Sequence, residues 1–366
     1  MPDNSPPLEY QILDPSRQQI RVVTVQPLRQ RYWLHILLFL ATLLSTLCIG
    51  AKLQDDFSHN VWPFANADYA LPWTWALLDW RHRLPLGIPF AACLLGILTA
   101  HEFGHYILCR RRGVQATLPY FIPFPSLFGT LGAVIRLRSP IHSRKDLFDI
   151  GIAGPIAGFV VAVPILMVSL YYSKPLTIQP GKGWPVLGLP LIFRVVRWAF
   201  SVLGVHTAAA KLSSPLYLAP TAVAAWVGML ATALNLLPAG QLDGGHIVFA
   251  LNPRAHRLAS QLCILGLLVL SWKYWVGWIT WAIILRVIGS RHPDVPLTPG
   301  LDKKSRVLAL SAALMLALTL MTAPIAGETM PQAFQDIRDG YREWRQERQR
   351  SPQPPQSAPP TSPSKQ

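Results

Sequence analysis

The stretch LPLGIPFAACLLGILTAHEFGHYILCRRR, residues 84–112, predicts a membrane-spanning helix with an ionisable group inside it. Residues 84–109 carry one formal charge, that of Glu102, and three arginines follow immediately. An uncharged run of this length can cross a bilayer as a single helix. Because a carboxylate at membrane depth is costly, Glu102 is expected to have a function.

The same helix contains the pattern His-Glu-x-x-His at residues 101–105. His101 and His105 share one face of a helix, so both imidazoles can bind one zinc ion while Glu102 exchanges a proton with water. The pattern therefore predicts a metallopeptidase site. The alternative is that the histidines bond to neighbouring helices and that Glu102 carries protons in a transporter.

The composition is typical of a polytopic membrane protein. Hydrophobic residues make up 51% of the chain and charged residues 14%, and the mean hydropathy is +0.31. The formal net charge of +15 comes from Arg and Lys that mainly flank apolar runs, where they set orientation and contact anionic headgroups. We therefore expect the lipid bilayer as a partner, and no nucleic acid.

The predicted fold is an all-α polytopic membrane protein with about six to seven transmembrane helices and a small membrane-associated β-hairpin near the active site. A cytoplasmic polar segment at 1–32 precedes the transmembrane domain at 33–327, and a polar, largely disordered tail follows at 328–366. Arginines before the first span place the N-terminus in the cytoplasm. The expected spans lie at about 33–53, 84–109, 148–172, 215–237, 258–288 as one or two helices, and 307–326.

A zinc site of this kind needs a third protein ligand from elsewhere in the chain. Asp243 is the strongest candidate, because it is the sole formal charge between Lys211 and Arg254 and is expected at a depth similar to that of Glu102. Proline and glycines around it interrupt a helix where backbone must approach a metal or substrate. Alternatively, Asp243 caps a helix.

Two weaker candidates remain for the metal. Asp149 stands at the start of the third span, where N-terminal capping explains it more simply. His246 follows Asp243 by three residues and is expected to support a ligand rather than to bind the metal.

Three motifs together resemble the site-2 protease family of intramembrane zinc metalloproteases: HEFGH at 101–105, LFDIGIAGPIAG at 147–158 and NLLPAGQLDGGH at 235–246. The resemblance covers roughly residues 84–290. It implies that His101, His105 and Asp243 bind one Zn²⁺ per chain and that Glu102 activates the attacking water. It also implies hydrolysis of peptide bonds in or near transmembrane segments of membrane-protein substrates.

The resemblance has three further implications. Asn235 would orient substrate or stabilise a developing oxyanion, although an amide bonding between helices explains it nearly as well. Many relatives carry a PDZ domain between the motifs, and this chain lacks the room, so it would belong to the PDZ-free branch. We expect an integral multi-pass protein of a bacterial inner membrane.

Residues 118–138 suggest how substrate is held. Prolines at 119, 123 and 125 and glycines at 129 and 132 break helix, and an alternating pattern follows from Val134. We expect a hairpin whose exposed edge, with Gly129, Val134 and Ile135, pairs with an unwound substrate. The alternative is a plain surface loop. Gly154 and Gly158 are expected to allow close helix packing.

Two other functions remain open. A zinc- or proton-coupled transporter would show paired internal repeats and more intramembrane charges, and neither is visible. A non-catalytic binder of transmembrane segments would lack a ligand or the glutamate, and all four residues are present.

Overall fold

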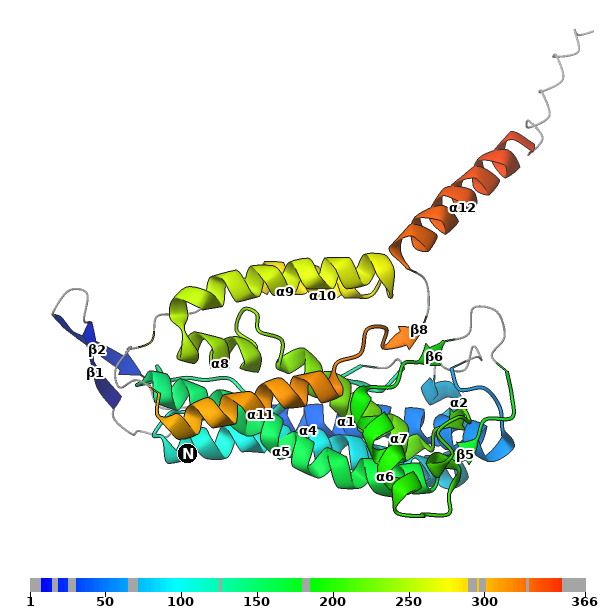
Figure 1. The fold of residues 1–366 in the computed structure, drawn as a ribbon, viewed down its shortest axis with the longest axis horizontal. Helices are drawn as coiled ribbons and strands as arrows, with labels where there is room; N and C mark the ends of the chain where they lie inside the picture. Colours follow the sequence, from blue (N-terminus) through cyan, green and yellow to red (C-terminus); the bar gives the residue numbers. More distant parts are fainter. Residues whose placement is uncertain are drawn as a thin grey trace, which may run out of the picture.

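A computed structural model describes residues 8–14, 19–25, 31–64, 72–124, 127–179, 185–288, 295, 301–326 and 329–350. The chain is mostly helical, and its long helices run side by side (Figure 1). Part of the predicted cytoplasmic segment, and residues 351–366 of the tail predicted at 328–366, lie outside the described residues. A polar helix, α12 (Met330–Arg350), precedes the latter and projects from the bundle (Figure 1).

Among the described residues, four helical segments are long and apolar enough to cross a membrane: Tyr32–His59, Trp80–Arg111, Arg144–Tyr171 and Pro253–Lys273. The first, third and fourth are α1, α5 and α9, and the second joins α3 (Trp80–Arg83), η2 (Leu84–Gly87) and α4 (Ile88–Arg111). The predicted spans at 33–53, 84–109 and 148–172 are therefore confirmed as helices of sufficient length. Residues 258–288 form two helices, because α9 ends at Lys273 and α10 (Trp278–Ile288) begins beyond a turn.

Two predicted spans are shorter than expected. The span at 215–237 contains α7 (Pro220–Asn235), and the span at 307–326 contains α11 (Lys303–Thr319). Pro238 has no N–H and disfavours helical backbone at the preceding residue, so α7 ends early. The chain then turns through Gly240, which has a φ of 57°, and enters α8 (Asp243–Leu251). This early break brings Asp243 to the first turn of a new helix.

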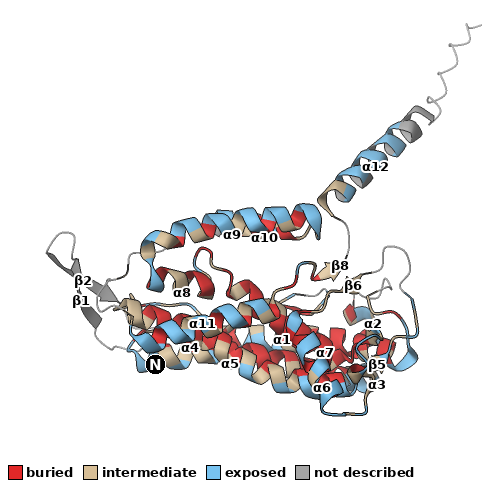
Figure 2. Ribbon diagram, viewed as in Figure 1, coloured by how far each residue is buried: buried red, intermediate tan, exposed pale blue. Residues whose placement is uncertain are grey.

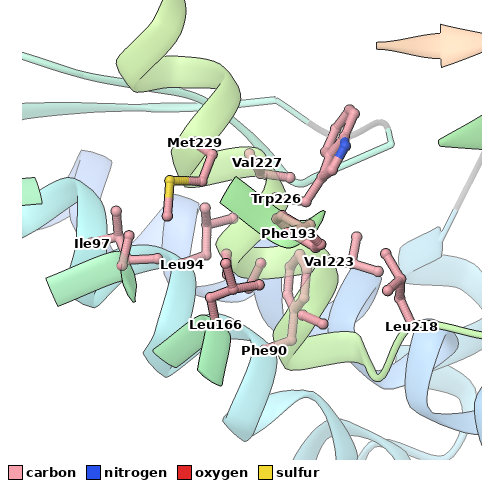
Figure 3. Packing of buried hydrophobic residues seen from close by; sticks show 14 of the residues in the cluster. Phe90, Leu94, Ile97, Leu166, Phe193, Leu218, Val223, Trp226, Val227 and Met229 are labelled. Carbon is pink, nitrogen blue, oxygen red and sulfur yellow. The ribbon is translucent and has the colours of Figure 1, made fainter. Parts of the chain in front are cut away.

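The core lies where α4, α5 and α7 pack together. Figure 3 shows large apolar side chains meeting there, and Phe90, Leu94, Trp226 and Met229 are completely buried. Burial is densest along these helices, whereas α9 and the described residues of α12 are mostly exposed (Figure 2). Exposed apolar side chains on α9 fit a surface that contacts lipid.

The predicted hairpin is present, and it packs against α1. Strand β3 (Tyr120–Pro123) pairs antiparallel with β4 (Thr130–Val134), with an irregularity between Phe121 and Pro123. The pairing continues beyond the strands, since the N–H of Thr117 donates to the carbonyl oxygen of Arg136. Pro125 lies outside the described residues.

The remaining elements are short and lie mainly toward the ends of the bundle. The short helices are α2 (Pro72–Leu78), α6 (Leu191–Val202) and η3 (Ala208–Ala210). The other antiparallel pairs join β1 (Leu8–Asp14) to β2 (Gln19–Val25), β5 (Lys174–Pro175) to β7 (Leu216–Tyr217), and β6 (Val186–Leu187) to β8 (Ile325–Ala326).

The capping explanation of Asp149 is wrong. The N-cap of α5 is Ser143, whose side chain accepts a hydrogen bond from the backbone N–H of Asp146. Asp149 instead forms ion pairs with Arg112, at the end of α4, and with Lys145, whose Nζ is 2.8 Å from its Oδ1. Asp149 therefore links α4 to α5 at the end of the bundle that contains residues 110–112, the three consecutive arginines.

Candidate metal centre

The structure brings His101, His105 and Asp243 together, although Asp243 is far from the histidines in sequence. The Nε2 atoms of the two histidines are 3.2 Å apart, and the Oδ2 atom of Asp243 is 3.2 Å from each of them. Both histidines are buried, and Asp243 is largely so. These side chains are a group that could hold a metal ion.

The spacing of the three donor atoms fits zinc. Where three donors occupy corners of a regular tetrahedron, its centre lies about 0.61 edge lengths from each corner. An edge of 3.2 Å therefore places a common centre about 2.0 Å from every donor, close to typical zinc–nitrogen and zinc–oxygen bond lengths. The fourth corner would remain for water or substrate. Two imidazoles and one carboxylate are also a donor set that zinc uses in hydrolases.

The backbone of α5 orients His105. The Nδ1 atom of His105 donates a hydrogen bond to the carbonyl oxygen of Ile150 over 2.7 Å. That bond leaves Nε2 with the lone pair that a metal needs.

Two glycines on α5 provide the space for both imidazoles. A Cβ at Gly154 would lie 2.0 Å from Nε2 of His105, and a Cβ at Gly158 would lie 3.3 Å from Nδ1 of His101. The predicted close helix packing at these glycines is confirmed.

The loop before Asp243 is held by α9. His256 Nε2 lies 3.0 Å from the carbonyl oxygen of Gly240, and the N–H of Gly240 donates to Ser260 Oγ over 3.2 Å. Both side chains are completely or almost completely buried. The turn that leads into Asp243 is thus anchored through both backbone polar groups of Gly240. The sequence alone does not point to His256 or Ser260, because polar residues on an apolar helix carry no local signal of a distant partner.

Glu102 faces the same site from α4. It is 6% exposed, and the backbone N–H of Ile135 donates a hydrogen bond to its carboxylate. The end of the hairpin is therefore joined directly to the predicted proton acceptor.

An open cavity of about 220 Å³ lies at this centre. Its walls include the donor group, Glu102, the hairpin residues Val134 and Ile135, and Asn235. The Nδ2 atom of Asn235 is 3.1 Å from Nε2 of His101. His246 also lines the cavity, and its Cβ lies close to Gly151 of α5.

Gly129 is the one predicted site residue that lies elsewhere. Its φ is 80°, its carbonyl oxygen accepts a hydrogen bond from Ser45 Oγ over 2.5 Å, and an added Cβ would lie 2.8 Å from backbone atoms of Thr46. Its position is against α1, away from the donor group.

The comparisons with known proteins agree with this site. The model of peptidase family M50 matches residues 89–270, which contain every residue of the donor group. The chain is 28% identical over 256 residues to the probable chloroplastic zinc metalloprotease EGY2 of Oryza sativa subsp. indica, covering 69% of this chain and 45% of that protein. It is 28% identical over 307 residues to the probable chloroplastic zinc metalloprotease EGY1 of Arabidopsis thaliana, covering 80% of this chain and 53% of that protein.

The chain thus spans about half the length of these relatives. The matched region includes the helix with both histidines, the glycines that make room for them and the helix that begins at Asp243. Over residues 89–270 the chain is thus similar to peptidase family M50, and it resembles the site-2 proteases.

Proposed function

We propose that the chain is an intramembrane zinc metalloendopeptidase that hydrolyses peptide bonds in or near transmembrane segments of membrane proteins. The observation that carries this proposal is the triangle of His101, His105 and Asp243, with edges of 3.2 Å, beside the buried carboxylate of Glu102. The names of the relatives, probable zinc metalloproteases, support both the metal and the reaction.

Each residue has a distinct part in the proposed reaction. Zinc bound by the triangle supplies positive charge that acidifies water and polarises a peptide carbonyl. Glu102 accepts the proton of the attacking water and later returns it to the leaving amine. Asn235 presents its amide N–H groups at the edge of the donor group, where a carbonyl oxygen would gain negative charge.

The hairpin offers a way to hold an unwound substrate. The carbonyl oxygen of Arg136 accepts the N–H of Thr117, and the N–H of Arg136 donates to Thr117 Oγ1, whereas the N–H of Ile135 points to Glu102. Alternate residues of a strand point their N–H groups in opposite directions. The N–H groups of Ala133 and Ile135 therefore point away from the opposite strand, whereas Val134 is paired with Tyr120. We propose that the outward edge at Ala133 and Ile135 pairs with substrate, and that Gly129 fixes the hairpin against α1.

The proposed setting is a bilayer crossed six to seven times. The four long apolar helices supply most of the crossings, and the shorter helices α7, α10 and α11 supply the rest. We propose that the N-terminus lies in the cytoplasm, because arginines precede α1 and follow α4. A bacterial inner membrane and a place in the PDZ-free branch also remain predictions, and the relatives named above are chloroplastic.

The proposed function is tested by cleavage of a membrane-helix substrate in detergent micelles. Purified protein should cut the substrate, lose this activity after treatment with a zinc chelator, and regain it when zinc is restored. Cleavage that survives complete removal of metal would contradict the metalloprotease function. Zinc-dependent movement of ions across vesicles without cleavage would favour the transporter, and substrate binding without cleavage would favour the non-catalytic binder.

A further inference from the structure

A second cavity lies at the opposite end of the bundle from the metal centre. It has a volume of about 220 Å³, and its walls come from the end of α1, the segment after α5, the start of α7 and helix α6. Two of the elements that line it, β6 and α6, are labelled at this end of the bundle in Figure 1. Gly151, at the metal centre, and Tyr171, at the other end of α5, are separated by roughly 30 Å of helix. The cavity is thus a separate site.

One charged side chain lines this cavity. Arg197 of α6 is 9% exposed, and its guanidinium donates to four backbone carbonyl oxygens. Nε donates to Ala209 over 3.1 Å, and Nη2 donates to Lys211, Leu212 and Ser214 over 2.7, 3.3 and 2.8 Å. Among the residues that the structure describes, none accepts a hydrogen bond from Nη1.

The guanidinium also lacks an acidic partner within the described part of the chain. Asp56, an acid near this end of α1, is 1% exposed and already pairs with Lys52 over 2.6 Å. Buried arginine is rare without a counterion, because carbonyl dipoles replace hydration only in part. Arg197 therefore brings a positive charge to the wall of a cavity, and its Nη1 keeps N–H groups without an acceptor among the described residues.

The rest of the wall is apolar, and its other polar groups are already occupied. Trp62 donates its indole N–H to the carbonyl oxygen of Pro185 over 3.0 Å, and the Tyr217 hydroxyl donates to the carbonyl oxygen of Val61 over 2.5 Å. Leucine, valine and proline side chains make up most of the remaining surface. A fitting ligand therefore has one anionic group attached to a compact apolar group.

The size of the cavity limits the ligand further. Cavities that hold drug-sized molecules measure roughly 300–1,000 Å³, so a space of about 220 Å³ holds one apolar side chain with its charged end. The two acyl chains of a phospholipid do not fit. A carboxylate accepts hydrogen bonds from a guanidinium strongly, because both groups are charged.

We propose that this cavity, the Arg197 pocket, binds the carboxy-terminal residue of a peptide. Arg197 Nη1 donates to the free α-carboxylate, and the apolar side chain of the peptide packs among the residues Trp62, Leu187, Leu216 and Val223. Hydrolysis of a peptide bond creates such a terminus, so the pocket distinguishes a chain that has already been cut from an intact one. The binding itself does not depend on the proposed proteolysis.

The test measures binding to the full-length Glu102→Gln protein in detergent, so that no peptide is consumed. The probe is a fluorescein-labelled pentapeptide, Gly-Gly-Ser-Ala-Leu, with either a free carboxylate or a carboxy-terminal amide, followed by fluorescence anisotropy. We expect the free acid to bind at least tenfold more tightly than the amide. Equal binding of the two peptides, or no binding of either, would overturn the proposal.

Variants locate the binding. Arg197→Gln should weaken binding of the acid at least tenfold, whereas Arg194→Gln, an exposed position on the same helix, should leave it unchanged. If Arg197→Gln does not fold, Val223→Phe and Leu216→Phe fill the cavity while keeping the arginine, and each should weaken binding by a similar factor. Unchanged binding to a folded cavity-filling variant would contradict the assignment to this pocket.

A competition experiment separates a peptide from a lipid headgroup. Nanodiscs of phosphatidylcholine, with or without phosphatidylglycerol, are added to the bound free-acid peptide. We expect the same amount of bound peptide with both. Displacement only by phosphatidylglycerol would assign the pocket to an anionic lipid and would overturn the peptide proposal.

Discussion

His105 and Gly154 lie so close together that the smallest side chain at position 154 would occupy the place of the ligand nitrogen. A Cβ on Gly154 would lie 2.0 Å from Nε2 of His105, and α5 at this point also accepts the hydrogen bond from Nδ1 of the same ring through Ile150. Helix α5 therefore shapes the metal centre without contributing a ligand.

Gly154→Ala should weaken zinc binding by at least about tenfold. Loss of groups that orient a metal ligand typically lowers metal affinity by roughly 10- to 100-fold. The added methyl group forces the imidazole of His105 to move, because the clash is with the ring itself. The measurement is zinc affinity by competition with a chromogenic chelator. Gly96→Ala is the matched control on α4, since a Cβ there meets no atom within 4 Å. Equal zinc affinity in the two variants would show that the ring is not confined by α5.

Asp243→Asn should lower zinc affinity and cleavage together. A neutral amide is a poorer ligand for zinc than a carboxylate, and the change keeps the size of the side chain. Zinc stoichiometry after dialysis and the rate of substrate cleavage provide the two readouts. If affinity and stoichiometry stay at the wild-type values, Asp243 is not the third ligand.

Ser260→Ala should weaken zinc binding by about tenfold, although Ser260 is on a different helix from every proposed ligand. Its Oγ accepts the N–H of Gly240, and loss of this bond loosens the turn that delivers Asp243. Ser271→Ala is the matched control, because Ser271 is equally buried on α9 and its hydroxyl donates to the carbonyl of Val276 instead. A similar loss in both variants would indicate a general effect on α9.

Ala133→Pro should reduce cleavage of a helical membrane substrate several-fold while leaving bound zinc unchanged. Proline removes the outward N–H that we propose pairs with substrate. Ala133→Gly keeps the N–H and is the control. A short extended peptide should be affected less, because it need not unwind. The substitution Ile135→Pro is less clean, because it also removes the hydrogen bond to Glu102. Unimpaired cleavage of the helical substrate by folded Ala133→Pro would reject strand pairing here.

Short sequence patterns predicted those features of the site that depend on residues near one another in the chain. The spacing of His101 and His105 determines their shared face, and the isolated charge of Asp243 identified it as the third member of the group. The prolines and glycines of residues 118–138 predicted the hairpin correctly, but their pattern could not show that Gly129 lies against α1.

The missed features depend on contacts between distant segments. Pro238 signals a break, yet its effect on the length of α7 and the start of α8 appears only in three dimensions. Asp149 stands where a cap would stand, but Arg112 from α4 reaches it, and Ser143 takes the capping position. His256 and Ser260 act through the backbone of Gly240, a role that neither residue type reveals.

The most direct test of the proposed mechanism compares zinc content and cleavage in the same preparations of wild-type protein and Glu102→Gln. Glutamine keeps the size of the side chain but cannot accept a proton from water, while both histidines and Asp243 remain in place. We expect one zinc per chain in both proteins and a loss of cleavage of at least about 100-fold in the variant. Wild-type cleavage by zinc-loaded Glu102→Gln would contradict the proposed mechanism.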